Sequence, residues 1–183
     1  MAQARALDAL LTARNQPLSQ TIHARLLKAI DSRRAKDVDA ILSNLALLEI
    51  HINPESRVKV TRGRGSAELR QGAENLLLAR VTNESGVTGP LRCFVPIREP
   101  GPASGRAGHP PTWLAARVIS LNGPSIQQRL SGGPVEYAVL SLSTQHVGLR
   151  EATLAFDVGQ GTQDLGFRGE LPVLFRCLRA LSK

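Results

Sequence analysis

The side chains best suited to chemistry lie near the end of the chain, between residues 157 and 168. Asp157, Asp164 and Arg168 stand there among three glycines and a threonine. Two nearby carboxylates can share acid and base work or bind a cation such as Ca²⁺, and an arginine can hold a carboxylate or phosphate with two hydrogen bonds. Aspartates in such loops more often bond their own backbone, and Arg168 has ion-pair candidates in Asp164 and Glu170. We favour this second, structural interpretation.

The glycine spacing in the same segment suggests a phosphate-binding loop, but the rest of the pattern is missing. Gly159, Gly161 and Gly166 do not fit the dinucleotide fingerprint, and no Lys-Ser or Lys-Thr pair follows them. A phosphate loop also needs a helix N-terminus behind it, whereas the segment that contains Pro172 has the pattern of a strand. The sequence therefore predicts a shaped connection between two strands.

Other catalytic and metal-binding patterns are missing from the sequence. His23, His51, His109 and His146 form no H-x-x-x-H or H-x-H pair, and no serine lies in a G-x-S-x-G elbow. We therefore expect no catalytic residue, no metal ligand and no cofactor in this chain. A metal-dependent hydrolase whose ligands come together from distant segments is the weakest of three functional hypotheses.

The two cysteines, Cys93 and Cys177, lie on separate predicted strands and form no C-x-x-C motif. They would pair if their strands faced each other across the core. We favour the alternative, in which both are small buried apolar side chains.

The chain carries a net charge of +8, and most of the excess lies in its middle. Residues 57–110 have nine basic and four acidic groups, a net +5, against +1 for residues 1–56 and +2 for residues 111–183. A basic cluster of this kind can bind a polyanion such as nucleic acid, or it can be a solvated strand face. Stacking aromatics are scarce there, so we favour the solvated face. The cluster comprises Arg57, Lys59, Arg62, Arg64 and Arg70.

The apolar spacing divides the chain into a helical part and a strand-rich part. Residues 1–48 show helical periodicity in three runs, with a break at Pro17 and Ser19 or Thr21 as a cap. From residue 49 onwards, short alternating segments are separated by turns that contain Gly, Pro and Asn. We expect strands near 50–60, 67–70, 76–81, 91–95, 113–121, 126–130, 135–143, 153–158 and 171–177, with 76–81 and 91–95 forming a hairpin.

These elements predict a mainly β protein: an antiparallel, immunoglobulin-like β-sandwich over residues 49–183, preceded by a short helical segment over residues 1–48. Aromatic residues make up only 3% of the chain, so the core must be aliphatic. No apolar run approaches the length of a membrane span. Residues 1–12 lack the pattern of an export signal.

Three segments, taken in order, carry a resemblance to a known family. Residues 52–60 (INPESRVKV), 81–91 (VTNESGVTGPL) and 150–168 (REATLAFDVGQGTQDLGFR) resemble the N-terminal, non-catalytic region of bacterial carbaryl-hydrolase-like metallohydrolases. These enzymes belong to the polymerase-and-histidinol-phosphatase superfamily. The resemblance covers residues 49–177, and the Pro/Gly-rich stretch 96–111 departs from the pattern of the group.

The resemblance implies an accessory β domain whose partner is a separate catalytic domain with His and Asp metal ligands. It also implies a periplasmic or secreted setting, although residues 1–12 show no export signal. Our first functional hypothesis is therefore a non-enzymatic interaction domain, and polyanion binding through residues 57–70 is the alternative. The oligomeric state stays open. As partner-binding residues in loops at the ends of the sandwich we propose Asn83, Glu84, Asp157, Gln160, Thr162, Asp164 and Arg168.

Overall fold

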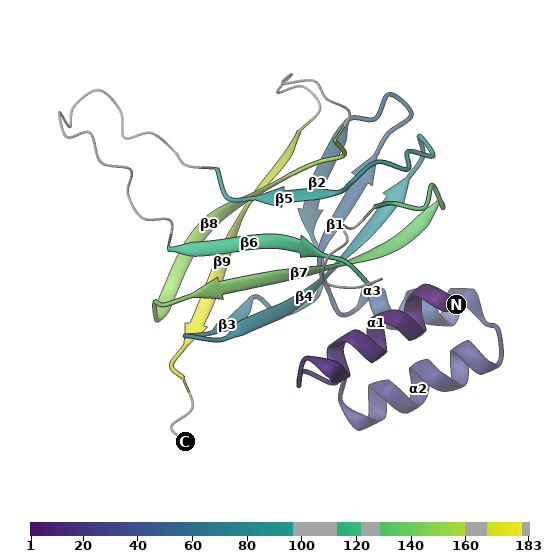
Figure 1. The fold of residues 1–183 in the computed structure, drawn as a ribbon, viewed down its shortest axis with the longest axis horizontal. Helices are drawn as coiled ribbons and strands as arrows, with labels where there is room; N and C mark the ends of the chain where they lie inside the picture. The colour runs from purple at the N-terminus through teal and green to yellow at the C-terminus, as the bar shows by residue number, and fades with distance from the viewer. Residues whose placement is uncertain (97–112, 122–128, 160–167, 181–183) are drawn as a thin grey trace.

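The computed structural model describes residues 1–96, 113–121, 129–159 and 168–180 (Figure 1). Three helices come first: α1 (Ala2–Ala13), α2 (Gln20–Asp31) and α3 (Ala35–Ser43). The strands of the described ranges follow: β1 (Ala46–Ile52), β2 (Val58–Arg62), β3 (Glu68–Arg70), β4 (Glu74–Asn83), β5 (Arg92–Phe94), β6 (Leu114–Ile119), β7 (Val135–Thr144), β8 (Gly148–Asp157) and β9 (Gly169–Leu178).

The three helices form where the apolar spacing predicts them. In α1, Ala4, Leu7 and Leu11 recur every three or four residues and are buried on one face. The expected cap of α2 is confirmed, because the Ser19 side chain accepts a hydrogen bond from the Ile22 backbone N–H at 3.4 Å. The third helix ends at Ser43, five residues before the predicted boundary at residue 48.

The strands form two curled sheets packed face to face. One sheet has the order β2-β1-β4-β7-β6, and the other has the order β3-β9-β8-β5. We call them sheet A and sheet B. An aliphatic core fills the space between them, and Phe156 and Phe175 are its largest fully buried side chains. The expectation of two layers of strands after a helical start is thus confirmed.

The expectation of purely antiparallel sheets is wrong at two places. In sheet A, β1 runs parallel to β4, with Ile50 opposite Val81; in sheet B, β3 runs parallel to β9, with Leu69 opposite Cys177. Both parallel pairs join strands that are distant in sequence. Local alternation shows which residues face the core, but it does not show which strand lies alongside or in which direction.

The predicted hairpin between residues 76–81 and 91–95 is also wrong. Strand β5 crosses to sheet B, where Cys93 lies opposite Phe156 of β8. It cannot join β4, because β1 and β7 already occupy the two sides of that strand. The turn over residues 83–87 therefore starts a crossing between the sheets.

The helices cover the outer face of sheet A (Figure 1). Leu7, Leu26 and Leu42 pack with Leu78 and Val139 in a second apolar cluster. The boundary predicted at residue 48 falls inside β1, because Ala46, Leu47 and Leu48 are strand residues with no exposed surface.

A three-residue polar link joins α3 to sheet A. Asp39 accepts two hydrogen bonds from Arg80, at 2.8 and 2.9 Å, and one from the Tyr137 hydroxyl at 2.6 Å. The Arg80 bonds, more than any other cause, hold the pKa of Asp39 below its usual value. Burial, followed by the bond to Asp39, raises the pKa of Tyr137.

Two glutamine amides attach α1 to the backbone of sheet A. The Gln3 side chain exchanges two hydrogen bonds with the N–H and C=O of Tyr137, at 3.0 and 3.2 Å. The Gln16 side chain accepts from the Leu76 N–H and donates to the Glu74 C=O, both at 2.9 Å. Tyr137 lies beyond the part of β7 that pairs with β6, and Glu74 and Leu76 lie beyond the part of β4 that pairs with β1. Each amide therefore satisfies main-chain groups that have no neighbouring strand on that side.

The two sheets come into direct contact where β9 begins beside β2. A Cβ atom on Gly169 would lie 2.8 Å from the Val58 carbonyl oxygen and 2.8 Å from a Val60 methyl carbon. Only a residue without a side chain fits there. This contact brings the edge of sheet A against the start of β9.

Candidate functional site

The proposed loop residues that the structure describes interact with other residues of the same chain. Asn83 is buried; its amide donates to the Val87 carbonyl at 2.9 Å, and its oxygen accepts from the Val87 N–H and the Ser85 hydroxyl. Glu84 pairs with His51, with 2.9 Å between Oε1 and Nε2. These bonds shape the turn and leave the Asn83 side chain no surface for a partner.

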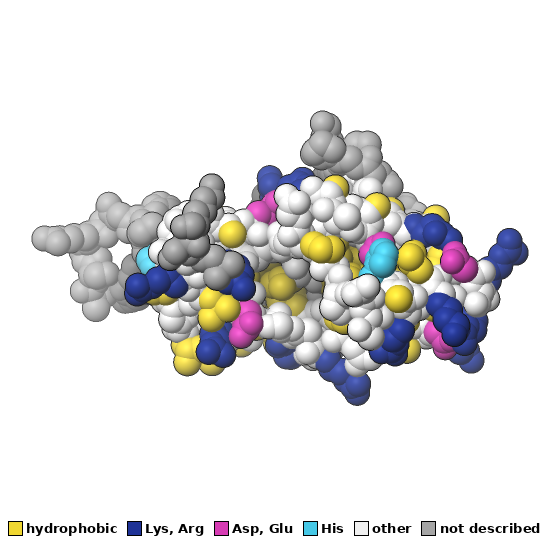
Figure 2. Space-filling view, turned by 90° about the horizontal axis from the view of Figure 1, so that it is seen from below, with side chains coloured by type: hydrophobic (Ala, Val, Ile, Leu, Met, Phe, Trp, Pro, Cys, Tyr) yellow, Lys and Arg dark blue, Asp and Glu magenta, His cyan; other side chains and the backbone are white. Residues whose placement is uncertain are grey.

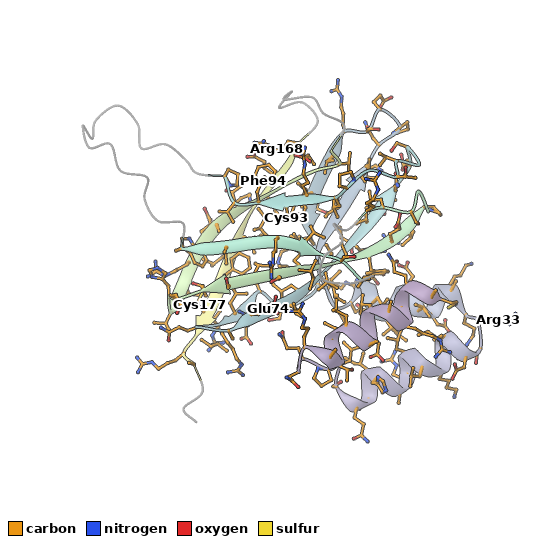
Figure 3. The ribbon with its side chains drawn as sticks, viewed as in Figure 1. Arg33, Glu74, Cys93, Phe94, Arg168 and Cys177 are labelled. Carbon is orange, nitrogen blue, oxygen red and sulfur yellow. The ribbon has the colours of Figure 1, made fainter. Side chains whose placement is uncertain are left out.

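Asp157 and Arg168 are also engaged within the chain. The Asp157 carboxylate pairs with Arg92 and accepts the Gly159 N–H at 3.2 Å, the self-bonding expected for an aspartate in such a loop. The Arg168 guanidinium lies 4.4 Å from the centre of the Phe94 ring and 3.7 Å from Glu170 (Figure 3). The other proposed loop residues, Gln160, Thr162 and Asp164, lie outside the described residues.

The structure brings some of these loops together. A Cβ on Gly89 would lie 2.5 Å from the Val158 carbonyl oxygen, and one on Gly159 would lie 2.7 Å from Pro90. The turn after β4 therefore packs on the end of β8, at one end of the sandwich. Arg168 instead stacks on Phe94 at the start of β9.

Two of the five basic residues proposed for polyanions, Arg62 and Arg64, bond within the chain. Arg62 donates to the carbonyl oxygens of Leu47, Gly63 and Gly65 at 2.5 to 2.7 Å, and desolvation lowers the pKa of its guanidinium. Arg64 donates to Asn44 at 3.0 Å. On the face shown in Figure 2, basic side chains are scattered among acidic ones. Lys59 lies on the edge strand β2, Arg57 immediately precedes that strand, and Arg70 lies on β3.

The described residues contain no group of three or more His, Cys, Asp and Glu side chains that could hold a metal ion. His23 instead pairs with Asp8, at 2.9 Å between Nδ1 and Oδ1. His109 lies outside the described residues. No described helix is both long and apolar enough to span a membrane.

Cys93 and Cys177 are free thiols that lie apart in the structure (Figure 3). Cys93 is opposite Phe156 and Cys177 is opposite Gly148, near the two ends of β8. Burial raises the pKa of Cys93 to about 12 and also raises that of Cys177. The raised pKa favours the protonated thiol at neutral pH. Cys177 is buried, as the favoured interpretation of the sequence predicts, whereas Cys93 is only partly buried.

The outer face of sheet B carries exposed apolar side chains. Leu149 on β8 is 70% exposed and Leu174 on β9 is 58% exposed. Leu149 lies opposite Arg176, and Leu174 lies opposite Glu151, so the two leucines are diagonal neighbours. The helices that cover the outer face of sheet A have no comparable contact with β8 or β9 among the described residues. We call this surface the β8–β9 face.

Ion pairs lie along sheet B, one beside Leu149 and two towards the other end of β8 and β9. Arg176 pairs with Glu68 on β3, Arg168 pairs with Glu170, and Arg92 pairs with Asp157. An apolar centre with a rim of charged pairs is the usual composition of a protein interface.

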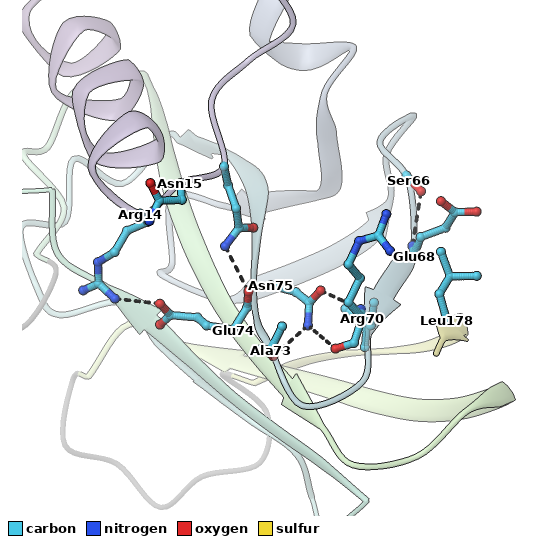
Figure 4. A pocket seen from close by; sticks show the side chains of 11 residues that line it. Arg14, Asn15, Ser66, Glu68, Arg70, Ala73, Glu74, Asn75 and Leu178 are labelled. Atoms are coloured by element: carbon cyan, nitrogen blue, oxygen red, sulfur yellow. Dashed lines mark hydrogen bonds and ion pairs between the residues drawn. The ribbon is translucent and has the colours of Figure 1, made fainter. Parts of the chain in front are cut away.

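A polar groove lies between the end of α1 and strand β3 (Figure 4). Its volume is about 620 Å³. We call it the β3 groove; its lining residues come from three segments, 14–16, 66–75 and 178. Among them, Glu74 accepts from the Ser141 hydroxyl at 2.6 Å and from Arg14 at 2.6 Å. The Ser141 bond, first among several causes, lowers the pKa of Glu74.

The sequence did not point to either surface. For the β8–β9 face a signal exists: Val173, Phe175 and Cys177 alternate toward the core, so Leu174 is an apolar residue in the polar phase. For the β3 groove no local signal exists, because its walls are far apart in the chain.

Comparison of the chain with models of known protein families gives no match, and comparison with curated proteins gives none. The resemblance to a metallohydrolase accessory region therefore stays a prediction. The β8–β9 face and the β3 groove are the two surfaces that could bind a partner or a ligand.

Proposed function

We propose that this chain is a non-enzymatic accessory domain that docks on a catalytic partner through its β8–β9 face. The partner we infer is a metallohydrolase catalytic domain, as the resemblance of residues 49–177 implies. We also propose that the two sheets are an immunoglobulin-like sandwich variant, in which helices cover one layer and leave the other for recognition.

The observation that carries this proposal is the pair of exposed leucines. Leu149 and Leu174 project from a hydrogen-bonded sheet, and burying their exposed fractions contributes about 2–4 kcal/mol before the costs of association. The surrounding ion pairs would give orientation and specificity rather than most of the affinity.

The first test is genetic. The coding sequence downstream of this one, or the adjacent gene, is searched for a domain rich in His and Asp. The two proteins are then produced together and their complex is measured by size-exclusion chromatography with light scattering.

The second step tests the face itself. We expect the double variant Leu149→Glu, Leu174→Glu to weaken the complex by at least about 100-fold, because two charges would be desolvated at its centre. Val135→Glu is the matched control, since Val135 is a 39% exposed apolar residue on sheet A. A complex that the double variant leaves intact would rule out the β8–β9 face, and a hydrolase-free genomic context would count against the partner.

A further inference from the structure

The β3 groove has the size of a small-molecule site, and it carries one guanidinium that bonds to no described residue. Its volume of about 620 Å³ lies within the usual range of ligand pockets. The floor is apolar where Leu69, Ala73 and Leu178 line it, and the rim is polar. Such a surface can bury the carbon skeleton of a ligand and bond its polar groups.

Most polar groups of the groove already have partners. Arg14 is bonded to Glu74, and both ends of the Gln16 amide are bonded to the β4 backbone. Glu68 pairs with Arg176 at 3.5 Å. The Arg70 guanidinium, by contrast, forms no hydrogen bond or ion pair with any described residue, although Arg70 lines the groove. Figure 4 shows it on the wall that β3 forms.

The free edge of β3 does not favour a peptide that adds as a strand. Strand β3 is the outermost strand of sheet B, so its outer backbone groups would be available to such a peptide. However, the Asn75 amide already bonds both backbone groups of Arg70 on that edge. Its oxygen accepts the Arg70 N–H at 2.7 Å, and its nitrogen donates to the Arg70 C=O at 3.2 Å. The Ser66 hydroxyl accepts the Glu68 N–H at 3.2 Å. The capped edge therefore fits a small molecule better than an extended chain.

The charges of the groove restrict the anion. Arg14 and Arg70 are balanced by Glu68 and Glu74 within the same lining. A doubly charged phosphate would meet both carboxylates, whereas a single carboxylate can pair with the Arg70 guanidinium through two parallel hydrogen bonds. We propose that the β3 groove binds a small monocarboxylate that also carries hydrogen-bonding groups, with Arg70 as the residue that recognises the carboxylate. This inference does not depend on the proposed docking face.

The test uses the full chain and defined probes. N-acetylglycine supplies one carboxylate and one amide, N-acetylglycinamide is its neutral counterpart, and inorganic phosphate is the competing anion. Each is titrated into ¹⁵N-labelled protein, and the backbone amide signals of Leu69, Arg70 and Asn75 are followed by NMR. We expect N-acetylglycine to shift these signals saturably, with a dissociation constant of about 1 mM, and the neutral probe to shift them at least about tenfold more weakly.

Variants separate recognition from general charge. Arg70→Gln should weaken N-acetylglycine binding at least about tenfold, and Arg70→Lys should weaken it less, because it keeps the charge but loses the two-pronged geometry. Arg25→Gln is the control, since Arg25 is an exposed arginine on α2, outside the groove. Arg70 is itself exposed, so these variants should fold, which their spectra show directly. Four results would overturn the proposal: no saturable shift, equal binding of the neutral probe, tighter binding of phosphate, or binding unchanged in Arg70→Gln.

Discussion

The end of α2 offers a sharp test of how the backbone is stabilised. Arg33 follows this helix with φ = 54°, a left-handed conformation that glycine adopts easily and arginine does not. The Arg33 N–H donates to the Ile30 carbonyl at 3.0 Å, and the Arg34 N–H donates to the Ala29 carbonyl at 2.9 Å. This is the Schellman arrangement, whose left-handed position is usually glycine. Replacing Arg33 by glycine should therefore stabilise the protein.

The expected gain follows from two opposing terms. The left-handed conformation costs a residue with a Cβ about 1–2 kcal/mol, which glycine avoids. Glycine loses about 0.5–1 kcal/mol through the greater freedom of the unfolded chain. Arg33→Gly should thus raise the free energy of unfolding by about 0.5–1 kcal/mol, and the Tm of a chain of this length by about 2 °C.

Urea denaturation and calorimetry would measure this gain, and two variants serve as controls. Arg33→Ala removes the same charge but keeps the Cβ, so it should bring no gain. Asn15→Gly changes the equivalent position after α1, where Asn15 has φ = 56°; asparagine tolerates this conformation, so the gain should be less than half as large. If Arg33→Ala stabilised the protein as much as Arg33→Gly, relief of charge repulsion would explain the gain and the conformational argument would fail.

Three further predictions concern other parts of the fold. Arg62→Ala should destabilise the protein by about 2 kcal/mol, because three carbonyl oxygens each lose a hydrogen bond from the guanidinium. Lys59→Ala should change the stability by less than about 0.5 kcal/mol. Heparin affinity lost in Arg62→Ala without any loss of stability would instead favour the polyanion hypothesis. The pKa of Glu74 is lower in the folded protein than in the unfolded chain, where it is about 4.3. Its ionised form therefore stabilises the protein above that value, and this contribution is lost as the pH falls through the folded-state pKa. Glu74→Gln should therefore flatten the stability profile below pH ~5, and an unchanged acid limb in urea titrations would disprove this. Because burial raises the pKa of both thiols, Cys93 and Cys177 should react with a thiol reagent at pH ~8 only after denaturation; rapid labelling of the native protein would contradict the structure.

The sequence predicts burial well where one element alone determines it. The alternation in residues 135–143 puts Tyr137 and Val139 on one face of the strand, and Leu140 and Leu142 on the other. In the structure, the first two pack beneath the helices and the last two lie between the sheets. Period-two alternation encodes these faces directly.

Pairing and boundaries were harder, because they depend on distant residues. Residues 46–48 form a short apolar run that suits a helix or a strand equally, and the neighbouring strands β2 and β4 decide the outcome. The partner of β5 likewise depends on the rest of the fold, because β1 and β7 occupy both edges of β4. The candidate surfaces follow the same rule: a single residue out of phase marks the β8–β9 face, while the β3 groove exists only once the chain has folded.

The glutamine attachments of α1 have an evolutionary consequence. Gln3 and Gln16 form hydrogen bonds with backbone groups rather than side chains, so substitution of the strand residues beneath them leaves these hydrogen bonds intact. Conversion of either amide to an acid, as slow chemical ageing can produce, would replace a donor with a second acceptor facing a carbonyl oxygen. These two polar attachments therefore tolerate substitutions in the sheet, and each depends on the amide nitrogen of one glutamine.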